Sequence, residues 1–249
     1  MSLNLCTDQL LMTLLPAQRI ASITWLSRTE GDPALLALAQ QLPINHGSPE
    51  EVLAARPDLV LAGRFTTANT RALLRRAGIP MLEVDPANDW EEIRSLTLQV
   101  AAAIGAEHRA QQLLDVMDAD LVRLAREQPA RPIRVIGWGG SGDDVPGRDT
   151  LFNTILEVAG GVNLAALGNG SRSFDLEQVL LAQPEVVMRG AAYSGKPALR
   201  NAVATHRALR AQKAVRLITY PEAVYGCGVP RAARLARDLA GTLRDAVTQ

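Results

Sequence analysis

The sequence lacks the long apolar runs and the excess of one charge that mark membrane-spanning and nucleic-acid-binding proteins. Over 249 residues, no apolar run approaches the roughly 18 residues that a membrane helix needs. Lys and Arg together number 26, as do Asp and Glu, so no overall basic field would attract nucleic acid or an anionic membrane surface. With 47% hydrophobic residues, the chain can still bury one large core or two smaller ones.

Cysteine, histidine and aromatic residues are scarce as well. The 2 cysteines and the 3 histidines (His46, His108 and His206) do not stand at the spacing of a metal site. No nucleophile, base and orienting group form a recognisable catalytic pattern, so we expect neither an enzyme nor a resident metal or cofactor. Aromatic residues make up only 4% of the chain, so the places where they gather are informative.

What the sequence does contain is one stretch that occurs twice. Residues 50–63 read EEVLAARPDLVLAG and residues 177–190 read EQVLLAQPEVVMRG. The two align without a gap and are identical at 7 of 14 positions, among them the opening glutamates Glu50 and Glu177. The chain is therefore expected to consist of two related halves.

Each copy has the pattern of a short helix followed by a buried strand. Pro57 and Pro184 end the helix, because proline has no backbone N–H and clashes with the preceding turn. The short apolar runs that follow are typical of strands covered on both faces of a parallel sheet, and Gly63 and Gly190 end them where the chain must turn. We predict an α/β fold with ligands bound at the loops after the strands.

The rest of the chain fits two such α/β lobes on either side of a helical middle. Up to residue 86, short apolar runs alternate with helical patterns, as in a mostly parallel sheet with helices on both faces. Residues 90–104 and 107–126 have helical apolar spacing, and the second helix would span roughly 30 Å. We predict an N-terminal lobe, a spacer helix region and a C-terminal lobe at residues 1–88, 89–129 and 130–249.

Four motifs, together with this order of lobes, carry a family resemblance. They are Ser2-Leu-Asn-Leu-Cys-Thr-Asp8, Pro49-Glu-Glu-Val-Leu-Ala-Ala-Arg-Pro-Asp-Leu-Val60, Leu156-Glu-Val-Ala-Gly-Gly-Val-Asn163 and the second copy from Leu176 to Val187. They resemble the substrate-binding proteins of bacterial ABC importers for vitamin B12, ferric siderophores and haem. The resemblance implies two lobes joined by one long rigid helix, a ligand cleft between them, and a location in the periplasm.

The same resemblance implies a role for the opening glutamate of each copy. In the vitamin B12 relatives this glutamate forms a salt bridge with arginines of the membrane permease, which carries over to Glu50 and Glu177. Ordinary first-turn glutamates that cap their helices are the alternative. We also expect the export signal to lie outside this sequence, because the opening residues Met1 to Cys6 contain no basic region and no cleavage site.

Side chains at the expected loops suit a large flat ligand. Aromatic rings would supply apolar walls, and arginines would bind carboxylate, amide or phosphate groups at the rim. Core packing of the rings and solvation of the arginines stay open as alternatives. The ligand-binding candidates of these two kinds are Trp25, Arg28, Arg64, Phe65, Trp138, Phe174, Tyr193 and Tyr225.

Cys6 and Cys227 are further ligand-binding candidates, because each is expected in a loop after a strand, in opposite lobes. Residues 2–5 are predicted to end the first strand, and Asp8 or its neighbour to cap a helix over residues 9–15. Three alternatives stay open for the cysteines: free thiols that contact the ligand, a disulfide, or soft ligands of a bound metal.

The resemblance implies that the protein captures a corrinoid such as vitamin B12, or a similar large metal chelate. A monomer would deliver this small-molecule ligand to the permease of an ABC importer in the inner membrane. Binding of a ferric siderophore or haem by the same mechanism is the alternative. An alternative of another class is a two-lobed tetrapyrrole metal chelatase, for which His46 is the only candidate base.

Overall fold

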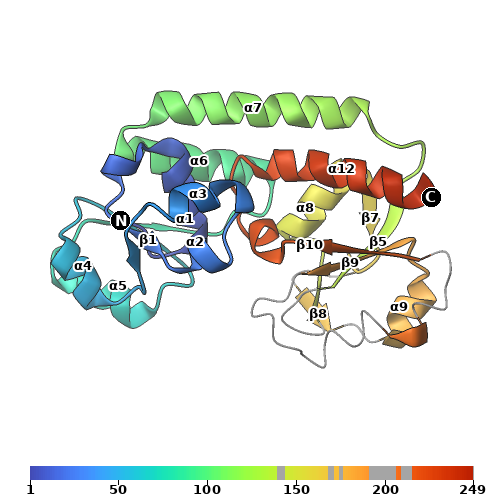
Figure 1. The fold of residues 1–249 in the computed structure, drawn as a ribbon, viewed down its shortest axis with the longest axis horizontal. Helices are drawn as coiled ribbons and strands as arrows, with labels where there is room; N and C mark the ends of the chain where they lie inside the picture. Colours follow the sequence, from blue (N-terminus) through green and yellow to red (C-terminus); the bar gives the residue numbers. More distant parts are fainter. Residues whose placement is uncertain (139–143, 168–170, 174–175, 191–205, 209–214, 249) are drawn as a thin grey trace. The chain divides into compact units, whose positions relative to one another are not determined.

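The computed structural model describes residues 1–138, 144–167, 171–173, 176–190, 206–208 and 215–248. The chain forms two compact units (Figure 1). Unit 1 comprises Met1–Asp115 and Cys227–Pro230, and unit 2 comprises Val116–Gly226 and Arg231–Gln249. The boundary near residue 115 falls inside helix α7 (Glu107–Arg126), within the predicted spacer region.

Unit 1 consists of short parallel strands with helices between them. Its strands are β1 (Ile23–Thr24), β2 (Ile44–Asn45), β3 (Val60–Gly63) and β4 (Met81–Val84). Its helices are α1 (Leu5–Leu14), α2 (Leu26–Thr29), α3 (Leu36–Ala39), α4 (Pro49–Ala55), α5 (Ala68–Arg76) and α6 (Trp90–Ile104), with 3-10 turns η1 (Ala17–Arg19) and η2 (Pro33–Leu35).

The strands of unit 1 are joined into one layer by the start of the chain. β1 pairs with β2 and β3 with β4, both in parallel. Between these pairs, the backbone N–H of Leu61 donates to Met1, that of Leu3 donates to Leu61, and that of Ser2 donates to Ser22, at 2.9, 2.9 and 3.1 Å. The alternation of short apolar runs with helical patterns in the sequence therefore gives the predicted parallel arrangement. The carboxyl ends of all four strands lie at one edge of the layer.

Unit 2 contains a larger parallel sheet. The sheet consists of β5 (Ile133–Trp138), β7 (Gly161–Asn163), β9 (Val186–Gly190) and β10 (Arg216–Tyr220). These strands are all parallel and lie in the order β10-β9-β5-β7. Separately, β6 (Asp144–Pro146) pairs antiparallel with β8 (Ser171–Ser173). Its other elements are α8 (Leu151–Val158), α9 (Leu176–Ala182), η3 (Glu222–Gly226) and α12 (Ala232–Thr248). Figure 1 shows α8 and α12 on the same face of the sheet.

Helix α8 approaches the sheet closely at one glycine. A Cβ built on Gly137 would lie 2.4 Å from the ring of Phe152, so only glycine leaves room for this ring against β5. Phe152 in turn contacts Tyr220 and Tyr225, with ring centroids 5.5 and 6.0 Å apart. This aromatic cluster fixes α8, β10 and η3 to one another.

The two copies of the repeat adopt the same structure. In both, a seven-residue helix leads to a parallel strand: α4 to β3, and α9 to β9. Two pairs of identical residues are completely buried in the core clusters of their units: Val52 and Val60 in unit 1, Val179 and Val187 in unit 2. The expectation of two related halves is confirmed at these positions.

Both copies also end their helix with the same unusual backbone. Arg56 has a φ of 44° and Gln183 has a φ of 48°, and they are the non-glycine residues with positive φ in the part of the chain that the structure describes. Each directly precedes the proline that stops the helix. Because L-residues rarely adopt this left-handed conformation, its presence in both copies shows that the helix-to-strand turn is set by the fold rather than by residue preference.

The predicted start of the first helix is wrong. Helix α1 begins at Leu5, and its N-cap is Asn4, whose side chain accepts from the backbone N–H of Cys6 at 2.9 Å. Cys6 thus lies in the first turn of α1 rather than in a loop. Asp8, expected as the cap, is buried inside unit 1 and bonded elsewhere.

Two other predictions were too long. Of the strand expected over residues 19–24, only the last two residues form β1; Arg19 instead ends η1, which is closed by a bond from the Ile20 N–H to the Ala17 carbonyl. The helix expected over residues 33–41 divides into η2 and α3. The helix expected around residues 197–209 lies largely outside the described residues.

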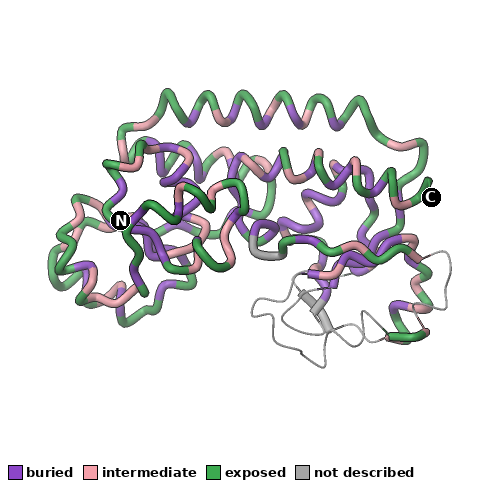
Figure 2. The backbone as a smooth tube through the Cα atoms, viewed as in Figure 1, coloured by how far each residue is buried: buried purple, intermediate pink, exposed green. Residues whose placement is uncertain are grey.

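Helix α7 is exposed along most of its surface, with one buried stripe (Figure 2). That stripe includes Ala110, Leu114, Met117 and Leu124, spaced at three to seven residues as on one face of a helix. In the described ranges, no helix combines the length and the apolar character of a membrane span.

Candidate functional site

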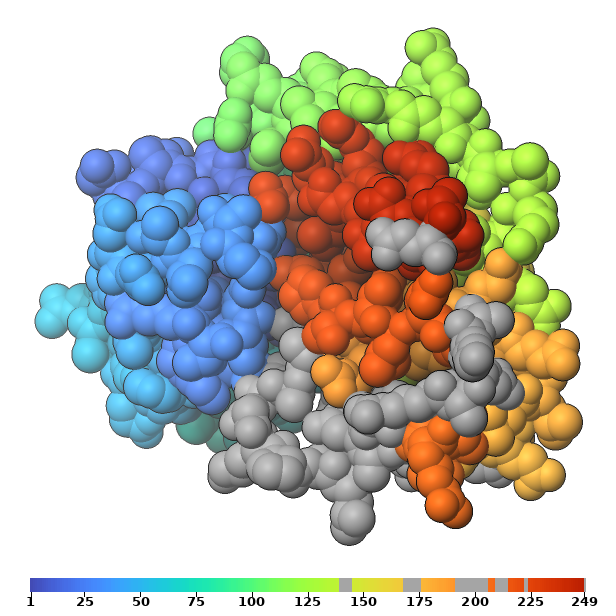
Figure 3. Space-filling model, turned by 45° about the vertical axis from the view of Figure 1, so that its right-hand side comes forward, coloured from blue at the N-terminus to red at the C-terminus, as the bar shows by residue number. Residues whose placement is uncertain are grey.

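The carboxyl ends of parallel strands are the first place to look for a ligand site. In unit 1 the loops after the strands begin with Trp25 after β1, His46 after β2, Arg64 after β3 and Asp85 after β4. The segment from β1 to α4, in mid-blue, lies on the surface of unit 1 (Figure 3). We call this edge of unit 1 the carboxyl edge.

Trp25 and His46 stack on each other at the carboxyl edge. They follow the paired residues Thr24 and Asn45, and the Trp25 N–H donates to the Asn45 carbonyl at 3.0 Å. The two ring centroids lie 6.4 Å apart with an angle of 23° between the ring planes. Trp25 is 40% exposed and the His46 side chain 65% exposed, so both rings remain open to a ligand.

Glu51 contacts both the backbone and the ring of His46. Its carboxylate accepts from the backbone N–H of His46 at 2.9 Å and of Ser48 at 3.1 Å, and it lies 3.2 Å from Nδ1 of the His46 ring. The Ser48 hydroxyl accepts from the Glu51 N–H in return, which completes a capping box at α4. Burial acts to raise the pKa of Glu51, but the hydrogen bonds from His46 and Ser48 outweigh it and hold the pKa below its ordinary value.

Asp8 binds residues that precede and follow Trp25 in the chain. Its carboxylate is fully buried and accepts from the Thr24 backbone N–H at 3.0 Å, from the Thr24 hydroxyl, and from the Ser27 hydroxyl at 2.7 Å. Burial raises the pKa of Asp8, and the hydrogen bonds from Ser2, Thr24 and Ser27 partly oppose this. Asp8 is therefore a positioning residue that sets the backbone around Trp25.

Asn45 supports the neighbouring loop in the same way. Its buried side-chain NH2 group donates to the carbonyls of Ser2 and Ile23 at 2.9 and 3.0 Å, and its oxygen accepts from the Gly47 N–H at 3.1 Å. These bonds join the first strand, β1 and the loop that carries His46. The position of His46 is thus set by buried polar groups on both sides.

The loop after β3 presents Arg64 and Phe65. Phe65 is 80% exposed, and Arg64 is exposed beside it. The two ends of this loop are held together by Arg71, because its guanidinium donates to the carbonyls of Gly63 and Thr66. A phenyl ring exposed to this extent has no packing role in unit 1, which leaves it available to an apolar ligand.

Arg28, by contrast, has a structural role. Its Nε donates to the Ala39 carbonyl at 3.1 Å and its Nη2 to the Leu42 carbonyl at 2.6 Å. These carbonyls belong to the last residue of α3 and to the turn after it. The guanidinium therefore closes this turn, and its predicted contact with ligand would have to use the opposite edge of the group.

The candidates in unit 2 are buried or lie outside the described residues. Trp138 is 1% exposed and packs in the apolar cluster of Ile136, while Tyr225 is 8% exposed and lies 4.9 Å from Tyr220, ring to ring. Burial raises the pKa of Tyr225 far above its usual range. Phe174 and Tyr193 lie outside the described residues. Ligand contact by these four rings stays a prediction.

Cys6 and Cys227 form a disulfide, with Cα atoms 5.0 Å apart. The alternatives of free thiols and of soft metal ligands are therefore wrong, and the expectation that the cysteines belong to opposite lobes is also wrong. Cys227–Pro230 belongs to unit 1, where a Cβ on Gly228 would lie only 2.0 Å from the Ala87 carbonyl oxygen. Gly228 therefore allows residues 227–230 to pack closely against Ala87, and the disulfide joins the same segment to α1.

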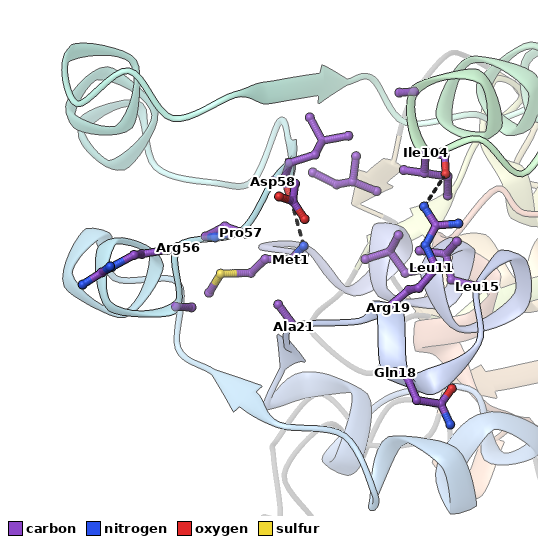
Figure 4. Close-up of a pocket in the computed structure, with 14 residues that line it drawn as sticks. Met1, Leu11, Leu15, Gln18, Arg19, Ala21, Arg56, Pro57, Asp58 and Ile104 are labelled. Carbon is purple, nitrogen blue, oxygen red and sulfur yellow. Dashed lines mark hydrogen bonds between the residues drawn. The ribbon is translucent and has the colours of Figure 1, made fainter.

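A cavity of about 440 Å³ lies at the opposite edge of unit 1. Ala21, Asp58 and Leu59, which precede β1 and β3, are among its lining residues, so it is at the amino ends of the strands. Figure 4 shows the Asp58 carboxylate directed toward Met1, and Arg56 extending away from the other lining residues. The cavity contains none of the predicted site residues.

Sequence reasoning missed His46 and Glu51 as a pair. The signal was present, because Ser48 and Glu51 stand at the spacing of a capping box and His46 lies two residues before Ser48. Within the described ranges, no three His, Cys, Asp or Glu side chains gather where they could hold a bare metal ion.

Comparison with protein families gives one match over most of the chain. The profile of the family described as periplasmic binding protein matches residues 2–219.

Curated proteins and solved structures agree with this match. An uncharacterized ABC transporter substrate-binding lipoprotein, YvrC of Bacillus subtilis, is 29% identical over 150 residues, covering 56% of this chain and 47% of the relative. A cobalamin-binding protein of Halobacterium salinarum is 29% identical over 164 residues, covering 61% of this chain and 44% of the relative. The match thus spans about half the length of these relatives. The periplasmic heme-binding protein RhuT of Roseiflexus sp. RS-1 shares the fold, with a TM-score of 0.81 at 22% identity, over 99% of this chain and 97% of that one.

Proposed function

Because the chain belongs to the periplasmic binding protein family, we propose that it is the substrate-binding component of an ABC importer and captures a corrinoid or a similar large metal chelate. The family consists of binding proteins rather than enzymes, so the chelatase alternative is set aside. The family and the lipoprotein relative place the protein outside the cytoplasm, and the periplasm is the location proposed.

The observation that supports a large flat ligand is the group of exposed rings at the carboxyl edge. Trp25, His46 and Phe65 follow three different strands, and all are exposed in a chain with only 4% aromatic residues. Exposed rings that follow several strands suit a macrocycle better than a sugar or an amino acid. The cobalamin-binding relative favours a corrinoid, and the heme-binding structural neighbour supports haem as the second candidate.

Titration of the intrinsic tryptophan fluorescence tests this function. The probes are aquocobalamin, cobinamide, haemin and a set of ferric siderophores, with equilibrium dialysis to confirm occupancy. We expect a saturable quench by one chelate class that Trp25→Phe reduces and that Trp90→Phe, in α6, leaves unchanged. Absence of saturable binding to every chelate would contradict the proposed function.

The permease is proposed to dock on Glu50 and Glu177. Both are exposed in the first turn of their helices, and they are identical residues at equivalent positions of the repeat. Val52 and Val60, with their counterparts in the second copy, are identical because they form the cores, but packing gives no reason for an exposed glutamate. In α4 the capping box is formed by Ser48 and Glu51, so Glu50 is not needed as a cap.

Charge reversal tests the docking role. Glu50→Arg and Glu177→Arg should each abolish uptake in cells, and each purified variant should bind the chelate with unchanged affinity. Glu91→Arg, an exposed first-turn glutamate of α6, is the matched control and should transport normally. A tenfold loss of chelate affinity in either variant, about 1.4 kcal/mol, would contradict docking as the role of that residue.

A further inference from the structure

The short segment Cys227–Pro230 belongs to unit 1, although the chain on both sides of it belongs to unit 2. η3 ends directly before it, at Gly226, and α12 follows it, from Ala232. The chain also passes between the units inside α7, after Asp115. We call residues 227–230 the inserted segment. Its attachment to unit 1 decides whether the units are joined through α7 alone or through a second connection as well.

The disulfide is the strongest attachment of the inserted segment to unit 1. The segment is buried, with Cys227 at 2% and Val229 at 4% exposure. However, Gly228 has no side chain, and its backbone packs closely on Ala87. Hydrophobic stabilisation is roughly proportional to the apolar area removed from water, and so short a segment has little of it. The covalent bond to Cys6 therefore matters more here than the packing.

The other end of the disulfide lies at the carboxyl edge. Cys6 stands in the first turn of α1, and its backbone N–H donates to the side chain of Asn4, the N-cap. Asn4 lies against the end of β3, because a Cβ built on Gly63 would be 3.0 Å from its side-chain nitrogen. Cys6 is only partly buried, whereas Cys227 is almost fully buried. A thiol in solution therefore has access to the bond from the side of Cys6.

We propose that the Cys6–Cys227 disulfide is a redox switch that controls how long the protein keeps its ligand. With the bond intact, the inserted segment stays in unit 1. Once the bond is reduced, the segment is free to leave unit 1, and bound chelate dissociates faster. This inference rests on the proposed function, since it takes the chelate as the ligand.

Reduction needs a dithiol as co-reactant, either a small molecule or a dithiol protein. One thiolate of the dithiol attacks Sγ of Cys6 and forms a mixed disulfide. The bond between the cysteines breaks, and Cys227 leaves as a thiolate that takes up a proton. The second thiolate of the dithiol then releases Cys6 from the mixed disulfide, and Cys6 takes up a proton as well. The dithiol ends as a disulfide, so the two electrons that it loses have passed to the two cysteines.

The first turn of α1 links the disulfide to the candidate ligand site. Asp8, two residues after Cys6, accepts from the Thr24 N–H at 3.0 Å and from the Ser27 hydroxyl at 2.7 Å, and thereby positions the loop of Trp25. Reduction removes a covalent constraint from this turn and from the inserted segment together. Coupling between two sites of a protein typically changes affinity by about 5- to 150-fold, and we expect about tenfold here.

Two measurements without ligand test the switch itself. Dithiothreitol, without denaturant, should expose both cysteines of the native protein as reactive thiols, and oxidised dithiothreitol should restore the bond. Amide exchange of the reduced protein should show lost protection at Gly228 and Val229, and less change at Val187 in β9 of unit 2. Thiols that react only in denaturant, or an inserted segment that stays protected after reduction, would overturn the inference whatever the protein binds.

Chelate dissociation tests the consequence for the ligand. The double variant Cys6→Ser with Cys227→Ser represents the reduced state, so no thiol or reductant meets the metal chelate. The probes are aquocobalamin, cobinamide and haemin, and recovery of tryptophan fluorescence after dilution gives the dissociation rate of whichever binds. We expect release about tenfold faster than from the native protein. Native protein that has been reduced, capped with iodoacetamide and freed of reagents is a second form without the bond and should behave alike.

Leu74→Ala is the matched control for a general loss of stability. Leu74 is completely buried in the core cluster of unit 1, so its truncation weakens that unit while the disulfide stays intact. The variant should release the chelate at the native rate. An acceleration equal to that of the double variant would overturn the redox switch.

The outcomes separate this inference from the proposed function. Equal dissociation rates in the native protein and in both forms without the bond would overturn the redox switch and leave the proposed function in place. If no chelate binds to the native protein at all, the proposed function fails and the inference fails with it.

Discussion

Units 1 and 2 carry the same repeated helix and strand but stabilise them differently. In unit 2, β9 lies inside a four-stranded sheet, and Val187 packs in an apolar cluster with Trp138. In unit 1, β3 pairs with β4 and with the first residues of the chain, and the loops at the carboxyl edge are held by buried polar groups, Asp8 and Asn45. Positions shared by the copies therefore set the fold, and residues outside the repeat, in unit 1, shape the site.

The disulfide should produce the largest difference between the units. It joins residues 221 positions apart, so the chain-entropy model gives on the order of 5 kcal/mol of stabilisation, an upper figure for such bonds. Cys227→Ser should lower the free energy of unfolding in urea by several kcal/mol. Amide exchange should show the loss in α1 more than in β9, because Cys6 and Cys227 both belong to unit 1.

A matched control separates the bond from the residue. The double variant Cys6→Ser with Cys227→Ser should unfold like either single variant, and a reductant should change only the native protein. Equal losses of protection in α1 and β9 would contradict the assignment of the disulfide to unit 1.

Asp8→Ala should have the next largest effect. It leaves the Thr24 N–H and two hydroxyls of unit 1 without their buried acceptor, which we expect to cost about 2 to 3 kcal/mol in the free energy of unfolding. Ser27→Ala removes one of these hydrogen bonds only and should cost about 1 kcal/mol. A change in Asp8→Ala smaller than that in Ser27→Ala would show that Asp8 does not organise the Trp25 loop.

Glu185 gives unit 2 a smaller, pH-dependent contribution. The Arg131 guanidinium holds the pKa of Glu185 below its ordinary 4.5; desolvation opposes this, and the Arg134 N–H adds to it. A carboxyl whose pKa is lowered by folding stabilises above its unfolded pKa, and that stability is lost as the pH falls through the folded pKa. Because the Arg131 side chain is 69% exposed and screened by water, we expect about 1 kcal/mol at most.

Urea unfolding as a function of pH checks this sign. Glu185→Gln should be less stable than the native protein at pH 7, and the two should converge as the pH falls below about 4. A difference that grew toward low pH would contradict the role of the Arg131 contact.

The smallest expected effect compares the two left-handed turns directly. Glycine at Arg56 or Gln183 removes the steric cost of a positive φ but adds freedom to the unfolded chain, so we expect a net stabilisation of about 0.5 kcal/mol. In the second copy, Arg134 also bonds the Ala182 and Gln183 carbonyls. Gln183→Gly should therefore keep its turn in place as well as Arg56→Gly does. If one variant raised the free energy of unfolding in urea and the other lowered it, the two copies would not be equivalent.

Regular elements could be predicted from the sequence because their signals are local. The bounds of α6 and α7 are those expected, since Gly105 separates the two helices with a φ of 63°. Apolar spacing and glycine carry this information without reference to the rest of the chain.

The candidate site depends on contacts that spacing does not encode. Asp8 looked like a helix cap, but its partners at Thr24 and Ser27 are 16 and 19 residues away, so local capping could not reveal its role. Likewise, Cys6 and Cys227 meet only because the segment after η3 packs in unit 1. The capping box of Ser48 and Glu51 could be predicted from the spacing of these residues. The stacking of Trp25 on His46 could not, because it follows from the register of β1 and β2.

Amide hydrogen exchange with and without bound chelate tests most directly that the ligand site is the carboxyl edge of unit 1. With aquocobalamin, cobinamide or haemin, whichever binds, the loops that start at Trp25, His46 and Arg64 should gain protection. The amides at the amino-edge cavity, such as Leu59, should not change. Protection centred on that cavity, or none at the three loops despite saturation with chelate, would contradict the account.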